Sequence, residues 1–316
     1  MSKEKEVSDS KKKKNSLWAK LALLIVAILW GSSLTVVKQS SEVFEPNFIL
    51  AVRFSLACIV LAAIFWSKLK ESTKSDWING LKIGVFLFMA YSSQTLGVTY
   101  TDPGRSAFLS ASYCVIVPFL AWMVMKVRPD RYNVIAAILA VVGIYFVSMA
   151  GSPGGGSVFE MGQDAILGDG LALLSGVLFA SHIVAVKKYS KGKDPILMTV
   201  IQFAMAAGLS WIVTLIFEDN SGMAVTQSSI FEMLYLAIMC TAVALLLQNI
   251  GQKHTDESSA AIILGLESVF GVIIPVMLGI EILTKYTIIG FALIFVAIII
   301  SETKLSFLTG QEHSEA

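Results

Sequence analysis

Charged side chains inside two apolar stretches are the first candidates for chemistry. Glu267 lies near the middle of the stretch 258–280, and Arg53 lies inside the stretch 46–67. A charge at the centre of a bilayer is costly unless it faces a protein interior, so it is a functional hypothesis by default. Glu267 is therefore interpreted as a proton-coupling or cation-binding carboxylate, or alternatively as a structural carboxylate paired with a neighbouring helix. Arg53 is interpreted as a structural or gating residue.

Uncharged polar and aromatic residues in the apolar stretches extend the set. A glutamine amide offers two donors and an acceptor, which suits the orientation of a polar substrate. Aromatic and hydroxyl side chains suit the walls of an organic ligand site. The alternatives are hydrogen bonds between helices and ordinary packing. The predicted substrate-binding residues are Trp30, Ser33, Tyr91, Gln94, Tyr113, His182, Gln248 and Glu267.

Two prolines inside apolar stretches are predicted to have structural or gating roles. Pro118 and Pro275 each remove one helical hydrogen bond, which leaves the carbonyls of Cys114 and Gly271 free. Such breaks can act as hinges or expose a carbonyl to a ligand.

Metal, cofactor and nucleic-acid sites are not predicted. The three cysteines form no CxxC pair, and of the three histidines only His182 lies in an apolar stretch. The chain contains neither GxxxxGK[ST] nor HExxH, so ATP hydrolysis and zinc-protease chemistry are not expected. Lys and Arg lie between apolar stretches and form no basic face for nucleic acid.

The elements that must position these residues are membrane helices. The chain has 316 residues, of which 55% are hydrophobic and 15% charged, whereas a soluble domain has about 25% charged residues. A span needs about 20 apolar residues, and only helices or closed barrels satisfy the backbone in lipid. Continuous apolar stretches favour helices. The ten predicted spans are 21–37, 46–67, 83–101, 106–125, 132–150, 170–186, 195–217, 233–252, 258–280 and 286–301.

The distribution of positive charge predicts the orientation of these spans. With the N-terminus inside, 19 of the 24 Lys and Arg residues fall on the inner side. Only Lys38, Arg105 and Lys285 fall on the outer side, while Arg53 and Lys82 lie within spans. Because Lys and Arg concentrate in cytoplasmic loops, we expect a multi-pass protein of the cell membrane with both termini cytoplasmic.

An internal repeat divides the spans into two groups of five. The segment Trp30–Lys38 matches Phe179–Lys187 at an offset of 149 residues, and the offset later becomes 154. Because five is odd, the second copy must be inverted, and inverted repeats are typical of secondary transporters with a site at the midplane. The equivalent positions include Pro46 and Pro195, Arg53 and Gln202, Gln94 and Gln248, Gly97 and Gly251, and Tyr113 and Glu267.

Several motifs then carry a resemblance to a known family. They are Trp30-Gly31, Pro46 followed by Arg53-Phe54, Gly104–Leu109 with Pro118, Leu247–Asn249, Ser258–Ala261, Leu266-Glu267 and Glu281. In this order they resemble the EamA-type family of the drug/metabolite transporter superfamily, over roughly residues 19–304. The resemblance implies ten helices in two inverted repeats around a cavity lined mainly by helices 1, 3, 4, 6, 8 and 9. The chain departs from the family pattern at Val127, the counterpart of Glu281, and at Ser268, where a proline often follows the glutamate.

The predicted organisation follows from the spans and the repeat. A Lys-rich cytoplasmic tail covers 1–18, a first repeat 19–150, an external Gly-rich linker 151–168, a second repeat 169–304 and a cytoplasmic tail 305–316. We expect an all-α integral membrane protein that exports small organic metabolites such as amino acids or amines, with protons as a candidate coupling ion. A membrane receptor that binds a partner without transport is one alternative, and an intramembrane enzyme is the other.

Overall fold

The protein is a bundle of helices, seen in a computed structural model that describes residues 2–126, 128–149, 162–253, 255 and 257–304. These residues contain helices, turns and short loops, and no strand. Residues 151–161 of the predicted linker, Val127 and the tail 305–316 lie outside the described residues. The helices are α1 (Ser2–Ser40), α2 (Pro46–Ile64), α3 (Trp66–Lys70), α4 (Lys74–Tyr100), α5 (Pro103–Ala111), α6 (Tyr113–Met125), α7 (Arg131–Met149), α8 (Gln163–Tyr189), α9 (Pro195–Phe217), α10 (Gln227–Leu234), the π-helical η3 (Tyr235–Val243), α11 (Ala244–Lys253), α12 (Glu257–Met277) and α13 (Lys285–Thr303).

Eight helical segments of the described chain are long and apolar enough to cross a membrane by length and composition. They correspond to eight of the predicted spans. The other two contain shorter apolar stretches, Arg131–Val147 in α7 and Ile263–Met277 in α12. Membrane crossing by these two, and so the full set of ten spans, stays a prediction.

Local sequence signals set where several helices begin. Pro46, Pro103 and Pro195 each lie in the first turn of a helix, where the missing N–H would have no helical partner. The first turn of α4 carries a capping box, in which Thr73 accepts from the backbone of Asp76 and the Asp76 carboxylate accepts from Thr73. Helices α2 and α9 begin at the predicted positions, whereas the capping box starts α4 at Lys74, nine residues before the predicted span 83–101.

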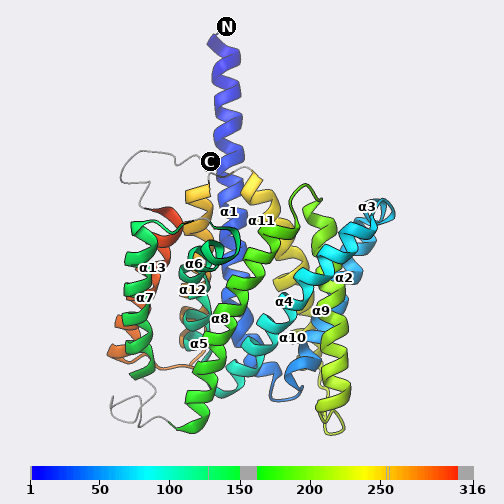
Figure 1. Ribbon diagram of the computed structural model, residues 1–316, viewed down its shortest axis with the longest axis vertical. Coiled ribbons are helices and arrows are strands. Elements are labelled where there is room, and N and C mark those ends of the chain that lie inside the picture. Colours follow the sequence, from blue (N-terminus) through cyan, green and yellow to red (C-terminus); the bar gives the residue numbers. More distant parts are fainter. Residues whose placement is uncertain (1, 127, 150–161, 254, 256, 305–316) are drawn as a thin grey trace.

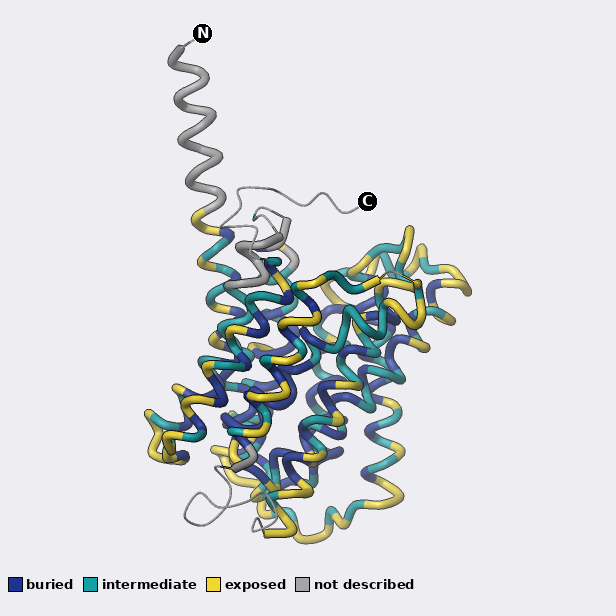
Figure 2. The backbone as a smooth tube through the Cα atoms, turned by 60° about the vertical axis from the view of Figure 1, so that its left-hand side comes forward, coloured by how far each residue is buried: buried dark blue, intermediate teal, exposed yellow. Residues whose placement is uncertain are grey.

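The bundle has two edges and a shared centre. Helices α7 and α13 pack together at one edge, and α2 and α9 pack together at the other (Figure 1). Buried residues follow the centre of the bundle, while exposed residues concentrate in the connecting loops and on outward faces (Figure 2). Exposed isoleucine, leucine and valine side chains are numerous on these outward faces, which suits contact with lipid.

Glycines let the two halves of the chain approach closely at equivalent places. A Cβ at Gly97 of α4 would lie 3.0 Å from Leu171 of α8, and a Cβ at Gly251 of α11 would lie 2.6 Å from Leu23 of α1. The two glycines are equivalent at the offset of 154 residues. Helices α1 and α8, which hold the equivalent segments around Trp30 and Phe179, run in opposite directions (Figure 1).

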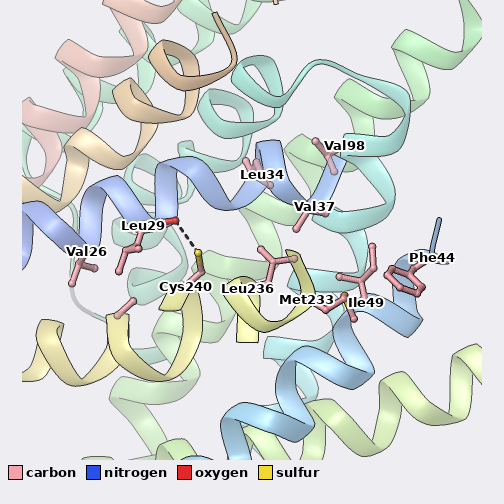
Figure 3. Close-up of a cluster of buried hydrophobic side chains, with 11 residues drawn as sticks. Val26, Leu29, Leu34, Val37, Phe44, Ile49, Val98, Met233, Leu236 and Cys240 are labelled. Atoms are coloured by element: carbon pink, nitrogen blue, oxygen red, sulfur yellow. Dashed lines mark hydrogen bonds between the residues drawn. The ribbon is translucent and has the colours of Figure 1, made fainter. Parts of the chain in front are cut away.

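One buried apolar cluster joins α1 to the π-helical segment. Val26, Leu29, Leu34 and Val37 of α1 pack with residues of η3 and α10, and the thiol of Cys240 donates to the carbonyl of Leu29 at 3.2 Å (Figure 3). The contact joins η3 to α1 and lies within the buried cluster that contains Cys240.

The predicted span 106–125 differs from expectation at two points. It consists of two helices, α5 and α6, which meet at Ser112 rather than at Pro118. The carbonyl of Cys114, predicted to be free because of Pro118, accepts a hydrogen bond of 3.0 Å from the Ser301 hydroxyl of α13. A neighbouring helix therefore satisfies this carbonyl, so it is not available to a ligand. Pro275 lies within the last turn of α12, close to its end at Met277.

Candidate functional site

A cavity of about 330 Å³ lies between the two halves of the chain. Its described walls come from α1, α2, α4, α5 and α6 on one side of the repeat boundary, and from α8, α9, η3, α11 and α12 on the other. All eight predicted substrate-binding residues line it, and Pro118 and Pro275 are not among its described lining residues. The predicted polar residues that the cavity brings together are Trp30, Ser33, Tyr91, Gln94, Tyr113, His182, Gln248 and Glu267.

Glu267 and Tyr113 meet directly in the cavity. The Tyr113 hydroxyl donates to Oε1 of Glu267 at 3.0 Å. These residues are equivalent positions of the two repeats, so their contact lies where the repeats face each other. Tyr113 is the first residue of α6, directly after the break at Ser112. Within the described chain Glu267 has no cationic partner at salt-bridge distance, so its charge faces the cavity with one hydroxyl donor.

Arg53 also lines this cavity, which corrects the expectation that its helix lies away from it. The side chain is buried, at 2% exposure. Its Nε donates to the Thr241 hydroxyl at 2.7 Å, its Nη1 donates to the Ser33 hydroxyl at 3.4 Å, and its guanidinium lies 5.1 Å from the centre of the Tyr91 ring. Among the described residues no carboxylate lies at salt-bridge distance from it.

The contact between Arg53 and Ser33 has an equivalent in the second repeat, made by different residues. His182 Nε2 and Gln202 Oε1 are 2.8 Å apart. His182 is equivalent to Ser33, and Gln202 is equivalent to Arg53, both at the offset of 149 residues. Gln202 was not in the predicted set, although its equivalence to Arg53 was the signal that could have placed it there.

The predicted eighth span lines the cavity through the segment η3, whose π-helical form and whose cavity residues Cys240 and Thr241 the sequence did not predict. The Thr241 hydroxyl donates to the carbonyl of Leu236, five residues earlier, at 2.8 Å. The indole Nε1 of Trp30 donates to the carbonyl of Cys240 at 3.1 Å. Short π-helical turns are frequent at functional sites. Here the turn places the Thr241 hydroxyl where it accepts from Arg53.

Aromatic rings and free amides complete the lining. The Tyr91 ring lies 5.1 Å from those of Phe54 and Phe179, centre to centre, in edge-to-face arrangements. Gln94 and Gln248 line the cavity, and within the described residues their amides make no hydrogen bond. The arrangement combines aromatic surface, two amides with free donors and acceptors, a guanidinium and a carboxylate. It can bind a small organic molecule that carries polar or charged groups.

A separate polar network closes the end of the bundle where α8 begins. Arg105 of α5 forms a buried ion pair with Asp169 of α8, which also accepts from the Thr101 hydroxyl at 2.7 Å. In the loop after α12, Glu281 accepts from the backbone N–H of Gly104 at 2.9 Å. Burial raises the pKa of Glu281 to about 7, against the opposing effect of this hydrogen bond.

The opposite end of the bundle is held by more exposed ion pairs. The distance from Lys68 Nζ to Asp194 Oδ2 is 2.5 Å, and the distance from Lys193 Nζ to Asp76 Oδ1 is 2.9 Å. Each pair joins the first half of the chain to the second. No group of three or more metal-ligating His, Cys, Asp or Glu side chains occurs in the part of the chain that the structure describes.

Apolar helices, equivalent contacts in two halves and a polar cavity between them define a helical membrane protein of the transporter class. The family sequence model of the EamA-like transporters matches this chain twice, over residues 17–149 and over residues 166–303. The chain belongs to the EamA-like transporter family. The two matches fit an architecture of two repeats.

Individual relatives agree with this assignment. An uncharacterized transporter of Archaeoglobus fulgidus is 34% identical over 288 residues, which cover 90% of this chain and 85% of the relative. The uncharacterized transporter YvbV of Bacillus subtilis (strain 168) is 25% identical over 70% of this chain and 71% of its own. A crystal structure of a protein with 18% identity has a similar fold, with a TM-score of 0.63 over 92% of this chain and 98% of that one.

Proposed function

We propose that the protein is a secondary transporter that exports small organic metabolites, such as amino acids or amines, by alternating access of its two repeats around the cavity. It would lie in the plasma membrane with both termini cytoplasmic. The proposed repeats cover 19–150 and 169–304, between the tails 1–18 and 305–316, with 151–168 as the external linker. The eight predicted substrate-binding residues would contact the substrate, with Arg53, Pro118 and Pro275 in structural or gating roles.

The observation that carries the proposal is the contact between Glu267 and Tyr113 at the meeting point of the repeats. A motion that exposes the cavity first to one side and then to the other changes the surroundings of both residues. A carboxylate there can bind a proton in one state and release it in the other. Glu267 is therefore the proposed coupling residue, and Tyr113 its hydrogen-bond donor.

The test is transport in reconstituted vesicles, with the export direction read from inverted membrane vesicles. We expect a proton gradient to drive substrate accumulation by the unaltered protein. Glu267→Gln keeps the shape of the side chain and cannot lose a proton, so it should abolish gradient-driven accumulation while the protein remains folded. Glu71→Gln is the matched control, because Glu71 lies exposed beyond α3 and outside the cavity. Accumulation by Glu267→Gln equal to the control would remove Glu267 from the coupling step.

A further inference from the structure

Two equivalent helical runs, α4 in the first repeat and α10, η3 and α11 in the second, differ in length by one residue. Thr73 caps the start of α4 and Thr226 caps the start of α10, each within a capping box, and the two are 153 residues apart. Further along, Gln94 and Gln248 line the same cavity and are 154 residues apart. The second run therefore contains one residue more than α4 between these two points.

The π-helical segment η3 lies within this interval and accommodates the extra residue. Each residue of an α-helix turns the chain by about 100°, so one more residue would rotate Gln248 out of the cavity. A π-helix bonds each N–H to the carbonyl five residues earlier instead of four, and so takes up a residue without that rotation. The N–H of Ala244 donates to the carbonyl of Met239 in this way. The π-helical form thus keeps Gln248 in the position equivalent to Gln94.

Contacts from the first repeat hold the π-helical turn. The indole Nε1 of Trp30 donates to the carbonyl of Cys240 at 3.1 Å, and Nε of Arg53 donates to the Thr241 hydroxyl at 2.7 Å. This hydroxyl in turn donates to the carbonyl of Leu236. Trp30 and Arg53 both line the cavity. A change at the cavity wall can therefore act on η3 through two hydrogen bonds.

The equivalent part of α4 is packed too closely to move in the same way. A Cβ at Gly84 would lie 2.5 Å from that of Met205 and 2.8 Å from the carbonyl oxygen of Gln202, both in α9. The equivalent position in η3 is Ile238, whose side chain is exposed. The backbone of α4 is thus in contact with α9 at the position where η3 presents an outward side chain.

We propose that η3 is a hinge of the second repeat, and that loss of its contacts with Trp30 and Arg53 lets α11 move relative to α10 during alternating access. A π-bulge is one of the few features that kink a helix, and hinges are short segments that absorb changes of backbone angle. The inference rests on the proposed transport function and adds the element that moves. It gives Arg53 a gating role that acts through Thr241.

Deletion of equivalent residues tests whether one residue of η3 is extra. Met239 of η3 and Val85 of α4 are equivalent at the offset of 154 residues. Deletion of Met239 should convert η3 to an α-helix with Gln248 still in the cavity, and the unfolding temperature of the detergent-purified protein should change by less than about 4 °C. Deletion of Val85 should rotate the rest of α4, with Gln94, by about 100° and prevent folding. Equal losses in the two variants would contradict the inference.

Amide hydrogen exchange tests the hinge without a ligand. In the unaltered protein, peptides from 235–253 (the η3–α11 peptides) should exchange at least about 10-fold faster than peptides from the equivalent stretch 81–99 of α4, because local opening exposes their amide groups. Deletion of Met239 should remove this difference. Equal exchange of the two stretches in the unaltered protein would overturn the hinge.

Thr241→Val tests the contacts that hold the hinge. Valine keeps the shape of the side chain and lacks the hydroxyl, so Arg53 loses an acceptor and the Leu236 carbonyl loses a donor. The η3–α11 peptides should exchange about 5-fold faster, which corresponds to the loss of about one hydrogen bond. Ser210→Ala is the control, because it removes a buried hydroxyl that donates to the Ala206 carbonyl within α9. Exchange of the η3–α11 peptides that is the same in both variants would contradict the role of these contacts.

Flux into reconstituted vesicles separates this inference from the proposed function. The probes are radiolabelled leucine and putrescine, an amino acid and an amine. If the unaltered protein moves a probe, deletion of Met239 should slow that flux at least about 10-fold, because the hinge motion is part of each cycle. Equal flux in the two proteins would mean that the protein is a transporter and that the hinge fails alone. If the unaltered protein moves neither probe, the proposed function fails for these two compounds, and hydrogen exchange still decides the hinge.

Discussion

Arg53 and Arg105 are buried to nearly the same extent, at 2% and 5% exposure, and differ in what neutralises them. Arg105 has a carboxylate partner, Asp169, which a threonine hydroxyl also supports. Arg53 has hydroxyl partners and a ring, and no described carboxylate. Arg105 joins the two halves of the chain at one end of the bundle, whereas Arg53 faces the cavity. The completed charge pair joins two helices of different halves, whereas the guanidinium of Arg53 is held by uncharged groups beside the cavity.

The largest effect is expected from breaking the completed pair. Asp169→Asn leaves the buried Arg105 with no carboxylate at salt-bridge distance among the described residues, and removal of one partner of a buried ion pair costs about 3–5 kcal/mol. The free energy of unfolding should fall by that amount, as measured by unfolding in mixed detergent with a denaturing surfactant. Asp164→Asn, on the exposed first turn of the same helix, should change little. Equal stability of the two variants would show that the pair does not hold this end.

A second arginine introduced into the cavity should cause the next largest loss of stability. Gln202→Arg places a guanidinium at the repeat equivalent of Arg53, beside His182 rather than beside hydroxyls. An uncompensated arginine within a membrane helix costs about 2.5–3.5 kcal/mol. The unfolding temperature without ligand should fall accordingly.

The opposite substitution, arginine to glutamine at position 53, tests the same effect of an unpaired charge on stability. Arg53→Gln removes a charge that has no counter-ion at salt-bridge distance among the described residues, so the protein without ligand should be as stable as the unaltered one, or more stable. A loss of stability as large as that of Gln202→Arg would mean that Arg53 is a structural residue after all.

A change of pH should alter the free energy of unfolding by less than these substitutions do. At the end of the bundle that holds Arg105, this pH dependence is set by the titration of Glu281. Burial raises its pKa to about 7 from the ordinary value of 4.5. The folded protein therefore holds a proton that the unfolded chain has lost, and stability is fully present below about pH 4.5 and is lost as the pH rises through 7. Between pH 6 and pH 8 the loss should be about 1 kcal/mol. The charged groups that act on Glu281 are Asp102 and Arg105.

Glu281→Gln tests this pH dependence directly. Its amide oxygen can still accept from Gly104, and it does not titrate. The difference in unfolding free energy between the variant and the unaltered protein should therefore change with pH. A difference that stays constant from pH 6 to pH 8 would assign the titration to another group.

The sequence predicted what depends on composition and on the repeat, and missed what depends on helix rotation. Apolar stretches with capping residues between them placed eight of the predicted spans, although the stretch 106–125 forms two helices. Polar and aromatic residues within apolar stretches, together with the cavity that the family resemblance implies, predicted eight side chains that do line one cavity. The stretch 46–67 is apolar on all sides, so its sequence does not show which face of α2 turns inward. The cavity position of Arg53 therefore could not be predicted.

Two further features depend on contacts between distant segments. The π-helical turn depends on the bond from Thr241 to the Leu236 carbonyl and on packing against α1. The break at Ser112 occurs where α5 meets α8, since a Cβ at Gly176 would lie 2.6 Å from the Ser112 hydroxyl. Neither feature has a local signal in the sequence. Pro118 is a local signal, but the carbonyl of Cys114 that it was predicted to leave free accepts a hydrogen bond from Ser301.

The smallest effect is expected at the opposite end of the bundle, where Lys68 and Asp194 are 39% and 37% exposed at their side chains. Burial opposes ionisation of Asp194, but the Lys68 ammonium and the N–H groups of Ile196 and Leu197 hold its pKa below the ordinary value. Lys68→Gln leaves these N–H bonds and the α9 cap in place. Because water and salt screen exposed pairs, the free energy of unfolding should fall by less than about 1 kcal/mol, and less still in high salt. A loss as large as that of Asp169→Asn would mean that exposure does not separate the two ends, and the contrast between completed buried pairs and screened surface pairs would fail.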